Sequence, residues 1–269
     1  MKLGFIGGGN MAAAMIGGLL QKGFASEAIC VAETQPERRA WLSKEFAVSV
    51  EESAAQTLGA DVVVLAVKPQ QLSALLKSLP PLKPHQLVLS IAAGVRAPDI
   101  SRWLGHHPAV VRAMPNTPAL VGAGIAGLYA LPGVSEVQKG QASLILDAVG
   151  AAVWVADEAQ IDTVTAISGS GPAYVFYFIE ALEQAGVDLG LPPETARLLT
   201  LQTFLGAAAL AIKDQSPPAE LRARVTSKGG TTERGILALE DGGVKYTIGL
   251  AARAAAERAR EMGDQLGKD

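Results

Sequence analysis

Hydrophobic residues follow different patterns in the two halves of this 269-residue chain. From residue 2 to about residue 155, short apolar runs rich in β-branched residues alternate with helix-like segments. Several runs are apolar throughout, which is typical of parallel strands covered on both faces. This alternation predicts a doubly wound α/β domain, in which residues 124–130 and 151–156 could form antiparallel edge strands. The other predicted strands cover residues 3–6, 29–32, 61–67, 87–93 and 110–114.

Beyond about residue 157 the strand pattern disappears and long helices follow, separated by Gly, Pro and Asp turns. The segment ARLLTLQTFLGAAALAI has almost no polar face. A helical half of this size can hardly bury such a helix on all sides. We therefore expect a homodimer interface there, with a tightly packed monomeric bundle as the alternative. The predicted helices cover residues 172–185, 193–213 and 244–266, and the predicted domains are 1–156 and 157–269.

Composition mainly excludes other classes of protein. A formal net charge of -3 with scattered positive residues gives no sign of a nucleic-acid surface. The single cysteine, Cys30, permits no intrachain disulfide and fits a reducing compartment. Glycines and Asn10 interrupt the apolar run at the N-terminus, which argues against a signal peptide. We expect a cytoplasmic protein that does not enter a membrane.

The first predicted strand leads directly into the sequence GFIGGGNMAAAMIGGLL. Gly7, Gly9 and Ala12 match the pattern G-x-G-x-x-G/A, and a helix follows. In this pattern the first glycine permits a tight turn, the second lets the backbone approach a diphosphate, and the third position packs closely on the sheet. Free N–H groups at the start of the helix would hold the diphosphate. The sequence therefore predicts a dinucleotide-binding domain.

The residue after the second strand bears on the choice of cofactor. Glu33 is placed to accept a hydrogen bond from a ribose 2′-hydroxyl, which favours NADH. Arg38 and Arg39 could instead pair with the 2′-phosphate of NADPH, or could simply be solvated helix residues. The sequence leaves NADPH and NADH open.

Three further strands end in candidate cofactor contacts, because open α/β sheets bind ligands at the carboxyl ends of their strands. AVKPQ places Lys68 and Pro69 after one strand, and SIAAGV ends another with small residues. RAMPNTPAL places Asn116 between two prolines, where a rigid turn can aim its amide at a nicotinamide. A turn with only a structural role would need the prolines but not the asparagine.

Two stretches of hydroxyl residues and glycines interrupt the helical half. In RVTSKGGTTERGI, Gly229 and Gly230 could direct successive N–H groups into an anion-binding nest beside the hydroxyls of Ser227 and Thr232. The alternative is a simple capping loop in which Thr231 or Thr232 is the N-cap. SGSGPAYVF, residues 168–176, places glycines and Pro172 inside a helical region, at a cost in stability.

The chain shows few of the usual catalytic groups. His85, His106 and His107 precede strands rather than follow them, and we expect them to be exposed loop residues. There is no metal-ligand spacing, no G-x-S-x-G motif and no candidate catalytic cysteine. Oxidation of an alcohol by a nicotinamide cofactor normally needs a His or Lys base. Reduction of an imine needs only groups that hold a carboxylate and orient the nitrogen, and hydroxyls with backbone N–H groups can supply these.

Six motifs in this order, GFIGGGNM, AVKP, SIAAGV, RAMPNTPA, SGSGPAYVF and TSKGGTT, resemble the pyrroline-5-carboxylate reductase family over essentially the whole chain. The resemblance implies reduction of 1-pyrroline-5-carboxylate to L-proline with NADPH or NADH, the last step of proline biosynthesis. It also implies a Rossmann domain followed by an all-helical dimerisation domain, with dimers that often assemble further into decamers.

The resemblance also implies roles for individual residues. Ser227 and the backbone at Gly230, Thr231 and Thr232 would bind the substrate carboxylate, and the Thr232 hydroxyl would bind the ring nitrogen as a proton donor. Two positions depart from the family: Lys228 stands where proline is common, and Glu33 stands where many members have small or amide side chains. The implied cofactor contacts are Ile6, Gly7, Gly8, Gly9, Asn10, Met11, Ala66, Val67, Lys68, Pro69, Ile91, Ala92, Ala93 and Pro172, to which the residue patterns add Glu33 and Asn116.

Two rival functions remain at this level. A hydroxyacid dehydrogenase of the 3-hydroxyisobutyrate type also joins a Rossmann domain to a helical one, but it needs a catalytic lysine in its long interdomain helix. The corresponding stretch from Ala173 to Leu182 contains no lysine. A non-catalytic NAD-binding regulator would need the nucleotide site but would have no use for both hydroxyl loops.

Overall fold

A computed structural model describes residues 1–268 of the chain. The contacts divide it into two compact units, residues 1–170 with 254–268 and residues 171–253. The sheet ends with Trp154, close to the boundary expected at residue 156. The helical segments on both sides of the second unit, residues 157–170 and 254–268, belong to the first unit by their contacts.

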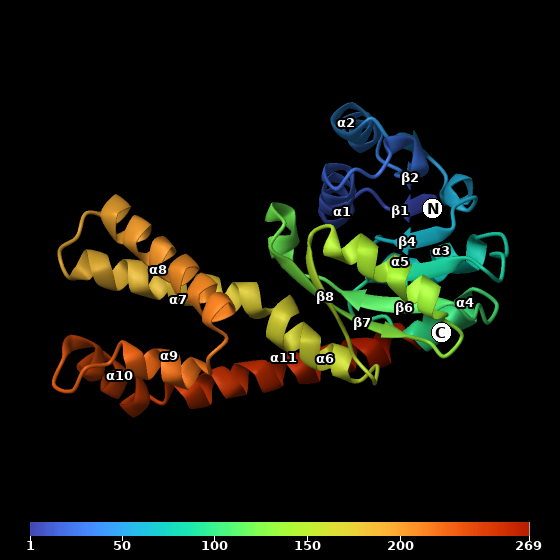
Figure 1. Ribbon diagram of the computed structural model, residues 1–269. Coiled ribbons are helices and arrows are strands. Elements are labelled where there is room, and N and C mark those ends of the chain that lie inside the picture. Colours follow the sequence, from blue (N-terminus) through green and yellow to red (C-terminus); the bar gives the residue numbers. More distant parts are fainter. Residues whose placement is uncertain (269) are drawn as a thin grey trace. The chain divides into compact units, whose positions relative to one another are not determined.

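The first unit is built on an eight-stranded sheet with the order β3-β2-β1-β4-β5-β6-β7-β8 (Figure 1). The strands β1 to β6 are parallel, β7 is antiparallel to β6, and β8 is parallel to β7. Of the two strands expected at an antiparallel edge, only β8 is an edge strand, because β7 lies inside the sheet. The strands are β1 (Leu3–Ile6), β2 (Ile29–Ala32), β3 (Ser49–Glu51), β4 (Val62–Leu65), β5 (Leu87–Ser90), β6 (Val110–Met114), β7 (Gly124–Ala130) and β8 (Gly150–Trp154).

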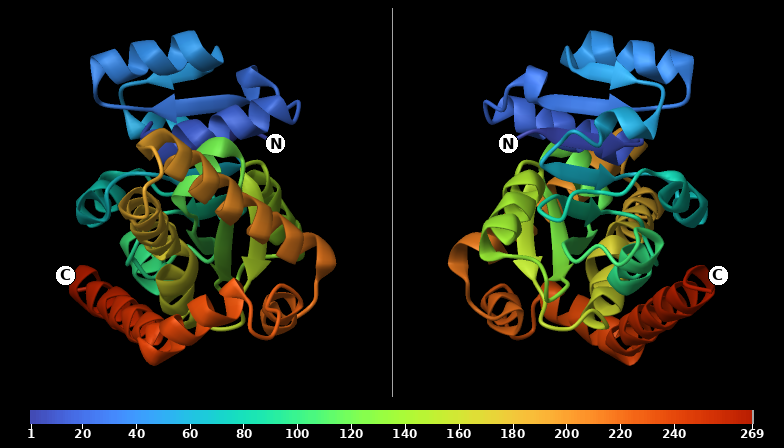
Figure 2. Two further views of the ribbon diagram at one scale, coloured as in Figure 1. Left: turned by 90° about the vertical axis from the view of Figure 1, so that its left-hand side faces the viewer. Right: turned by 90° about the vertical axis from the view of Figure 1, so that its right-hand side faces the viewer.

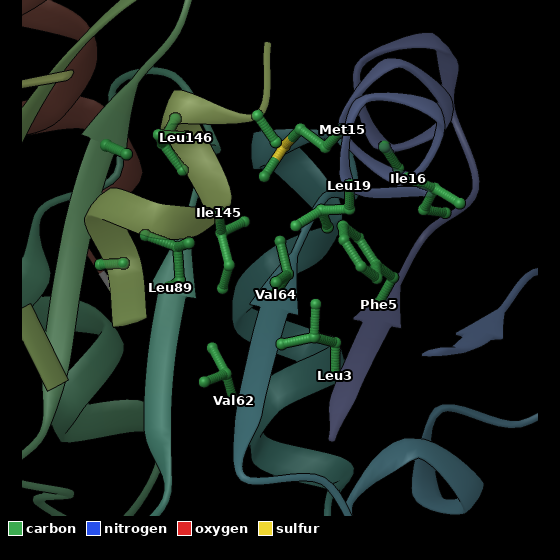
Figure 3. Packing of buried hydrophobic residues seen from close by; sticks show 14 of the residues in the cluster. Leu3, Phe5, Met15, Ile16, Leu19, Val62, Val64, Leu89, Ile145 and Leu146 are labelled. Carbon is green, nitrogen blue, oxygen red and sulfur yellow. The ribbon is translucent and has the colours of Figure 1, made fainter. Parts of the chain in front are cut away.

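Helices cover both faces of this sheet, as the continuous apolar runs predict. Successive strand residues point to opposite faces, so Val62 and Val64 belong to one apolar cluster and Val63 and Leu65 to the other. The first cluster packs under α1 and α5, where Phe5 of β1 meets Leu19 of α1 (Figure 3). The second packs under α3 and α4. The helices are α1 (Asn10–Gln21), α2 (Pro36–Phe46), α3 (Pro69–Ser78), α4 (Ala97–Trp103), α5 (Glu136–Asp147) and α6 (Gln160–Val164).

Short helical segments complete the first unit. Figure 2 shows α1 and α2 in blue beside the blue strands β1 and β2 at one end of the sheet. The segment that follows α6 is a π-helix, with the N–H of Ser170 bonded to the carbonyl of Thr165 at 2.7 Å. The segments are η1 (Ser26–Ala28), η2 (Ala54–Thr57), η3 (Thr117–Val121) and the π-helix η4 (Thr165–Gly169).

The second unit is all helical, in agreement with the sequence pattern. Its first two helices pack against each other, and a Cβ added to Gly186 would lie 3.1 Å from the Cβ of Ala196. The last helix begins in this unit, and its residues from Ala254 onward belong to the first unit. The helices are α7 (Gly171–Asp188), α8 (Pro193–Asp214), α9 (Pro218–Arg224), α10 (Thr231–Asp241) and α11 (Val244–Leu266).

Candidate active site

The predicted cofactor contacts of the first unit lie where the parallel strands end. The hydrogen-bond ladder continues past these ends, from the Gly7 N–H to the Ala32 carbonyl at 2.8 Å and from the Ala66 N–H to the Ile6 carbonyl at 2.8 Å. One edge of the sheet therefore carries the ends of β1, β2 and β4 side by side. A cavity of about 460 Å³ opens there, and seven of the predicted residues line it: Ile6, Gly7, Gly9, Glu33, Ala66, Val67 and Lys68.

The glycine turn after β1 has the conformation that a dinucleotide site requires. Gly7 has a φ of +100°, and a Cβ there would lie 2.7 Å from the carbonyl oxygen of Ala66, so only glycine fits. Ala12 is fully buried against the sheet. These two positions confirm the structural roles that the motif predicts.

The start of α1 is suited to hold a diphosphate. Asn10 and Met11 lie in the first turn, where backbone N–H groups have no intrahelical acceptor, and no acidic residue occupies this turn. A Cβ at Gly9 would meet nothing within 4 Å, so the backbone is open to close approach. The residues present therefore fit NAD(P)H: these N–H groups would hold its diphosphate, and the end of β2 would face its adenosine ribose.

Both backbone groups of Gly8 form hydrogen bonds within the first unit. Its N–H donates to Oε2 of Glu33 at 3.0 Å, and its carbonyl accepts from Nε of Arg38 at 2.6 Å. Neither backbone group of Gly8 is therefore a free diphosphate ligand. Instead, both tie the turn to the β2–α2 connection.

Asn116 has a structural role that the sequence did not reveal. Its side-chain nitrogen donates to the carbonyl of Ser168 at 3.1 Å, and its side-chain oxygen accepts from the N–H of Ile125 at 2.9 Å. The buried amide thus joins the end of β6 to β7 and to the π-helix. Both polar atoms of the amide therefore have partners within the protein, and its contact with a nicotinamide stays a prediction.

The loop after β5 contains Ile91, Ala92 and Ala93, and the C-terminal end of α11 supports it from behind. A Cβ at Gly94 would lie 3.2 Å from side-chain atoms of Met262 and Leu266. Next to it, Nη2 of Arg96 lies 2.6 Å from Oδ1 of Asp264, and this ion pair lowers the pKa of the aspartate. Sequence reasoning missed this support, because more than 160 residues separate the partners.

The second candidate site lies at the start of α10. Gly230 is the N-cap, and no side chain caps the helix, which contradicts the alternative with Thr231 or Thr232 as N-cap. The N–H groups of these two threonines lie in the first turn, where no intrahelical acceptor exists. Ser227, Thr231 and Thr232 are exposed, and their hydroxyls have no hydrogen-bond partner within residues 1–268.

The glycines before α10 do not form the open nest that the sequence suggested. The Gly229 N–H donates to Oε2 of Glu233 at 2.7 Å, and the Gly230 N–H donates to the Ser227 carbonyl at 3.0 Å. The glycines shape the turn, with a φ of +75° at Gly229, and the N–H groups left for an anion are those of the two threonines. Glu233 was overlooked as the residue that closes this turn.

In the other stretch of hydroxyl residues and glycines, residues 168–176, one hydroxyl is bonded within the protein. The Ser168 hydroxyl donates to the Val164 carbonyl at 2.9 Å within the π-helix. Pro172 is the second residue of α7, where proline is tolerated, so it does not break a helix. Its contact with a nicotinamide stays a prediction.

Of the three histidines, His107 contradicts the expectation of exposure. It is 5% exposed, and its Nε2 lies 2.7 Å from the carbonyl oxygen of Gln86. Burial lowers its pKa, and the bond to the carbonyl opposes this shift only in part. Its role is therefore structural. Among the described residues no group of three or more His, Cys, Asp and Glu side chains could hold a metal ion.

The second unit has a large apolar surface. Within residues 171–253 only Ala196 and Thr200 are buried. Of the described helices, α8 alone is long and apolar enough to cross a membrane by length and composition. Its side chains at Leu198, Leu205 and Ile212 are more than half exposed, so this surface requires a covering partner.

Comparisons with known proteins agree with both halves of this description. Residues 158–262 match the family model for pyrroline-5-carboxylate reductase dimerisation, which indicates a homo-oligomer. Residues 2–94 match the model for NADP oxidoreductase, coenzyme F420-dependent. The dimerisation match includes α8, which carries the exposed apolar side chains.

Relatives that match nearly the whole chain include several pyrroline-5-carboxylate reductases. The pyrroline-5-carboxylate reductase of Pseudomonas aeruginosa is 50% identical over 269 residues, which cover 99% of this chain and 98% of the relative. The solved reductase of Coxiella burnetii is 44% identical with a TM-score of 0.92, covering 97% of this chain and 98% of its own. That of Plasmodium falciparum, solved with NADP bound, is 32% identical with a TM-score of 0.87 and 98% coverage of both chains. The chain belongs to the pyrroline-5-carboxylate reductase family.

Proposed function

We propose that the chain reduces 1-pyrroline-5-carboxylate to L-proline with NADPH or NADH, as the last step of proline biosynthesis. The observation that carries the proposal is the end-to-end match to the P. aeruginosa reductase. Membership of this family favours the reductase over the hydroxyacid dehydrogenase, which needs a lysine that this chain lacks between Ala173 and Leu182.

The start of α10 supplies the groups that the substrate requires. The backbone N–H groups of Thr231 and Thr232, with the hydroxyl of Ser227, would bind the carboxylate, aided by the positive end of the helix dipole. The Thr232 hydroxyl would donate to the ring nitrogen. A carboxylate placed there also lies near Glu233, whose bond to the Gly229 N–H engages one of its oxygens.

The reduction converts the C=N bond of the ring to a C–N single bond. Bound NAD(P)H supplies a hydride to the imine carbon. The ring nitrogen takes up one proton, for which the Thr232 hydroxyl is the proposed donor, with solvent water restoring that hydroxyl. Because the charge of the carboxylate does not change, its contacts act mainly on binding and orientation.

Steady-state kinetics with each cofactor in turn test this proposal. Oxidation of NADPH or NADH should depend on 1-pyrroline-5-carboxylate, and L-proline should accumulate in equal amount. Cofactor binding without turnover would indicate the non-catalytic regulator instead. Oxidation of 3-hydroxyisobutyrate in the absence of imine reduction would indicate the hydroxyacid dehydrogenase.

Assembly of dimers into a decamer and a location in the cytoplasm belong to the same proposal. The dimerisation match supports association of copies without fixing their number. Light scattering on the purified chain gives the mass of the assembly. A mass of two copies would reject the decamer.

A further inference from the structure

The ribose end of the cofactor cavity is built around a carboxylate that is held in place. Oε2 of Glu33 accepts from the Gly8 N–H at 3.0 Å, and Oε1 accepts from the Gln35 N–H at 2.9 Å. Oε1 also accepts from the Thr34 hydroxyl at 3.5 Å. Each oxygen of an ionised carboxylate can accept about two hydrogen bonds, so Oε2 retains capacity for a further donor. The side chain therefore combines a fixed position with free acceptor capacity.

The two arginines near this carboxylate are turned to other partners. Nη1 of Arg39 donates to the carbonyls of Glu33 and Thr34 at 2.9 and 2.8 Å, and its Nη2 lies 3.8 Å from Glu52. Arg38 donates to the Gly8 carbonyl and stacks 4.2 Å above the ring of Trp41. Neither arginine lines the cofactor cavity, and Arg38 lines a different cavity between α1 and α2.

The charged side chains that line the cofactor cavity are Glu33, Glu52 and Lys68. Lys68 follows β4, which is separated from β2 by β1. Two strand spacings put its backbone roughly 10 Å from the end of β2, where the ribose hydroxyls are expected. Because Glu52 lies 3.8 Å from Nη2 of Arg39, the carboxylate at the ribose end that has no ion pair in the described part of the chain is that of Glu33.

We propose that this chain selects NADH over NADPH through Glu33. The proposal rests on the proposed function and adds the identity of the hydride donor. The ribose 2′-hydroxyl of NADH donates to the carboxylate of Glu33. A 2′-phosphate would instead bring negative charge against a fixed carboxylate, and no arginine lines the cavity to neutralise it. Because the P. falciparum relative was solved with NADP bound, the fold itself admits the phosphate, and side chains must make the selection.

Calorimetric titration of the full-length chain with NADH and with NADPH tests the proposal without relying on turnover. The dissociation constant for NADH should be at least about tenfold lower than that for NADPH, which is a difference of about 1.4 kcal/mol. Glu33→Gln retains an oxygen that can accept the Gly8 N–H but removes the charge. It should lower the preference about tenfold or more, chiefly by tightening NADPH binding. Glu33→Ser should shift the preference in the same direction.

Glu37→Gln is the matched control, because it removes an equal charge from the first turn of α2 at a position outside the cavity. It should leave the ratio of dissociation constants unchanged. Equal or tighter binding of NADPH by the unmodified chain would overturn the inference while leaving the reductase function intact. An unchanged ratio in Glu33→Gln would also overturn it. Failure to bind either cofactor would reject both the inference and the proposed function.

Discussion

At the scale of single residues, replacing Thr232 tests whether the start of α10 binds the substrate or is only the beginning of a helix. The structure shows no hydrogen bond from this hydroxyl to the helix it begins. Thr232→Val retains the shape and removes the donor. A hydrogen bond to a charged group contributes about 1.5–3 kcal/mol, so kcat/KM should fall on the order of ten- to a hundredfold. Steady-state kinetics with 1-pyrroline-5-carboxylate measure this change.

Ser227→Ala is the informative companion variant. A carboxylate contact is similar in the ground state and the transition state, so this change should act mainly through KM. Thermal unfolding of both variants is the control, and the unfolding temperature should remain unchanged because neither hydroxyl caps α10. A less stable Thr232→Val protein with normal turnover would contradict the substrate-site hypothesis.

The burial of His107 should make the stability of the protein depend on pH. Burial lowers the pKa of the imidazole below its ordinary value of 6.5, so the folded protein favours the neutral ring. Stability from this residue is therefore fully present above the unfolded-state pKa and is lost as the pH falls below it. Denaturant unfolding at about pH 7.5 and about pH 5.5 should show a smaller loss of stability in His107→Gln than in the unmodified chain.

The exposed His85 offers a matched substitution for that experiment. His85→Gln should retain the full pH dependence of the unmodified chain. If both variants lose stability equally on acidification, the buried imidazole is not the group responsible. The sequence pattern predicted an exposed His107 because this residue precedes a strand in a stretch flanked by Gly and Pro. The buried ring is hydrogen-bonded to the carbonyl of Gln86, which lies 21 residues earlier in the sequence.

At the scale of elements, a buried ion pair joins β6 to the start of α6. Arg112 is 3% exposed and lies 3.3 Å from Glu158 and 3.4 Å from Asp162. Removing one partner of a buried pair leaves the other charges uncompensated, at a cost of about 3–5 kcal/mol. Arg112→Met should therefore lower the free energy of unfolding by about 3 kcal/mol, as measured with chemical denaturant.

Arg258 provides the comparison for Arg112. It pairs with Glu261 at 2.7 Å on the surface of α11, where both side chains are about half exposed. Exposed pairs contribute about 0–1 kcal/mol, so Arg258→Met should be nearly neutral. Equal losses in the two variants would show that the buried network contributes no more than a surface pair.

The elements also show which parts of the fold a sequence pattern can predict. The strands β1, β2, β4, β5 and β6 have continuous or nearly continuous apolar runs because both of their faces are covered, and the sequence predicted all five. The three-residue edge strand β3 and the seven-residue helix α9 were missed, because elements so short have no measurable periodicity. The Asn116 amide donates a hydrogen bond to the carbonyl of Ser168 in the π-helix. These two residues are 52 positions apart in the sequence, so no local pattern could predict the contact.

In the candidate site, too, some features could be predicted from the sequence and others could not. The motif of Gly7, Gly9 and Ala12 could be identified because it lies within one strand–turn–helix unit, where the positive φ of Gly7 requires glycine. The hydrogen bonds of Gly8 and Glu233 involve side chains across turns, and no local sequence pattern predicts such bonds.

At the scale of the whole molecule, the helical unit cannot provide its own core. Only two of its residues are buried, whereas Leu205 of α8 is 64% exposed and Ile212 is 78% exposed. Burial of apolar area contributes about 25 cal/mol per Å², so a second copy that covers α8 would stabilise both copies. The unmodified chain should therefore sediment at micromolar concentration as a dimer or a multiple of one.

Leu205→Glu tests this association directly. A charge on the apolar surface of α8 would be buried without a partner in the assembly, so the equilibrium should shift to monomers or to unfolded chains. Sedimentation velocity should show a lower mass, and the unfolding temperature should be lower than that of the unmodified chain at the same protein concentration. Val137→Glu on α5 is the control, because this residue is 74% exposed and belongs to the first unit. A stable, folded monomer of the unmodified chain at micromolar concentration would contradict the proposed interface on α8.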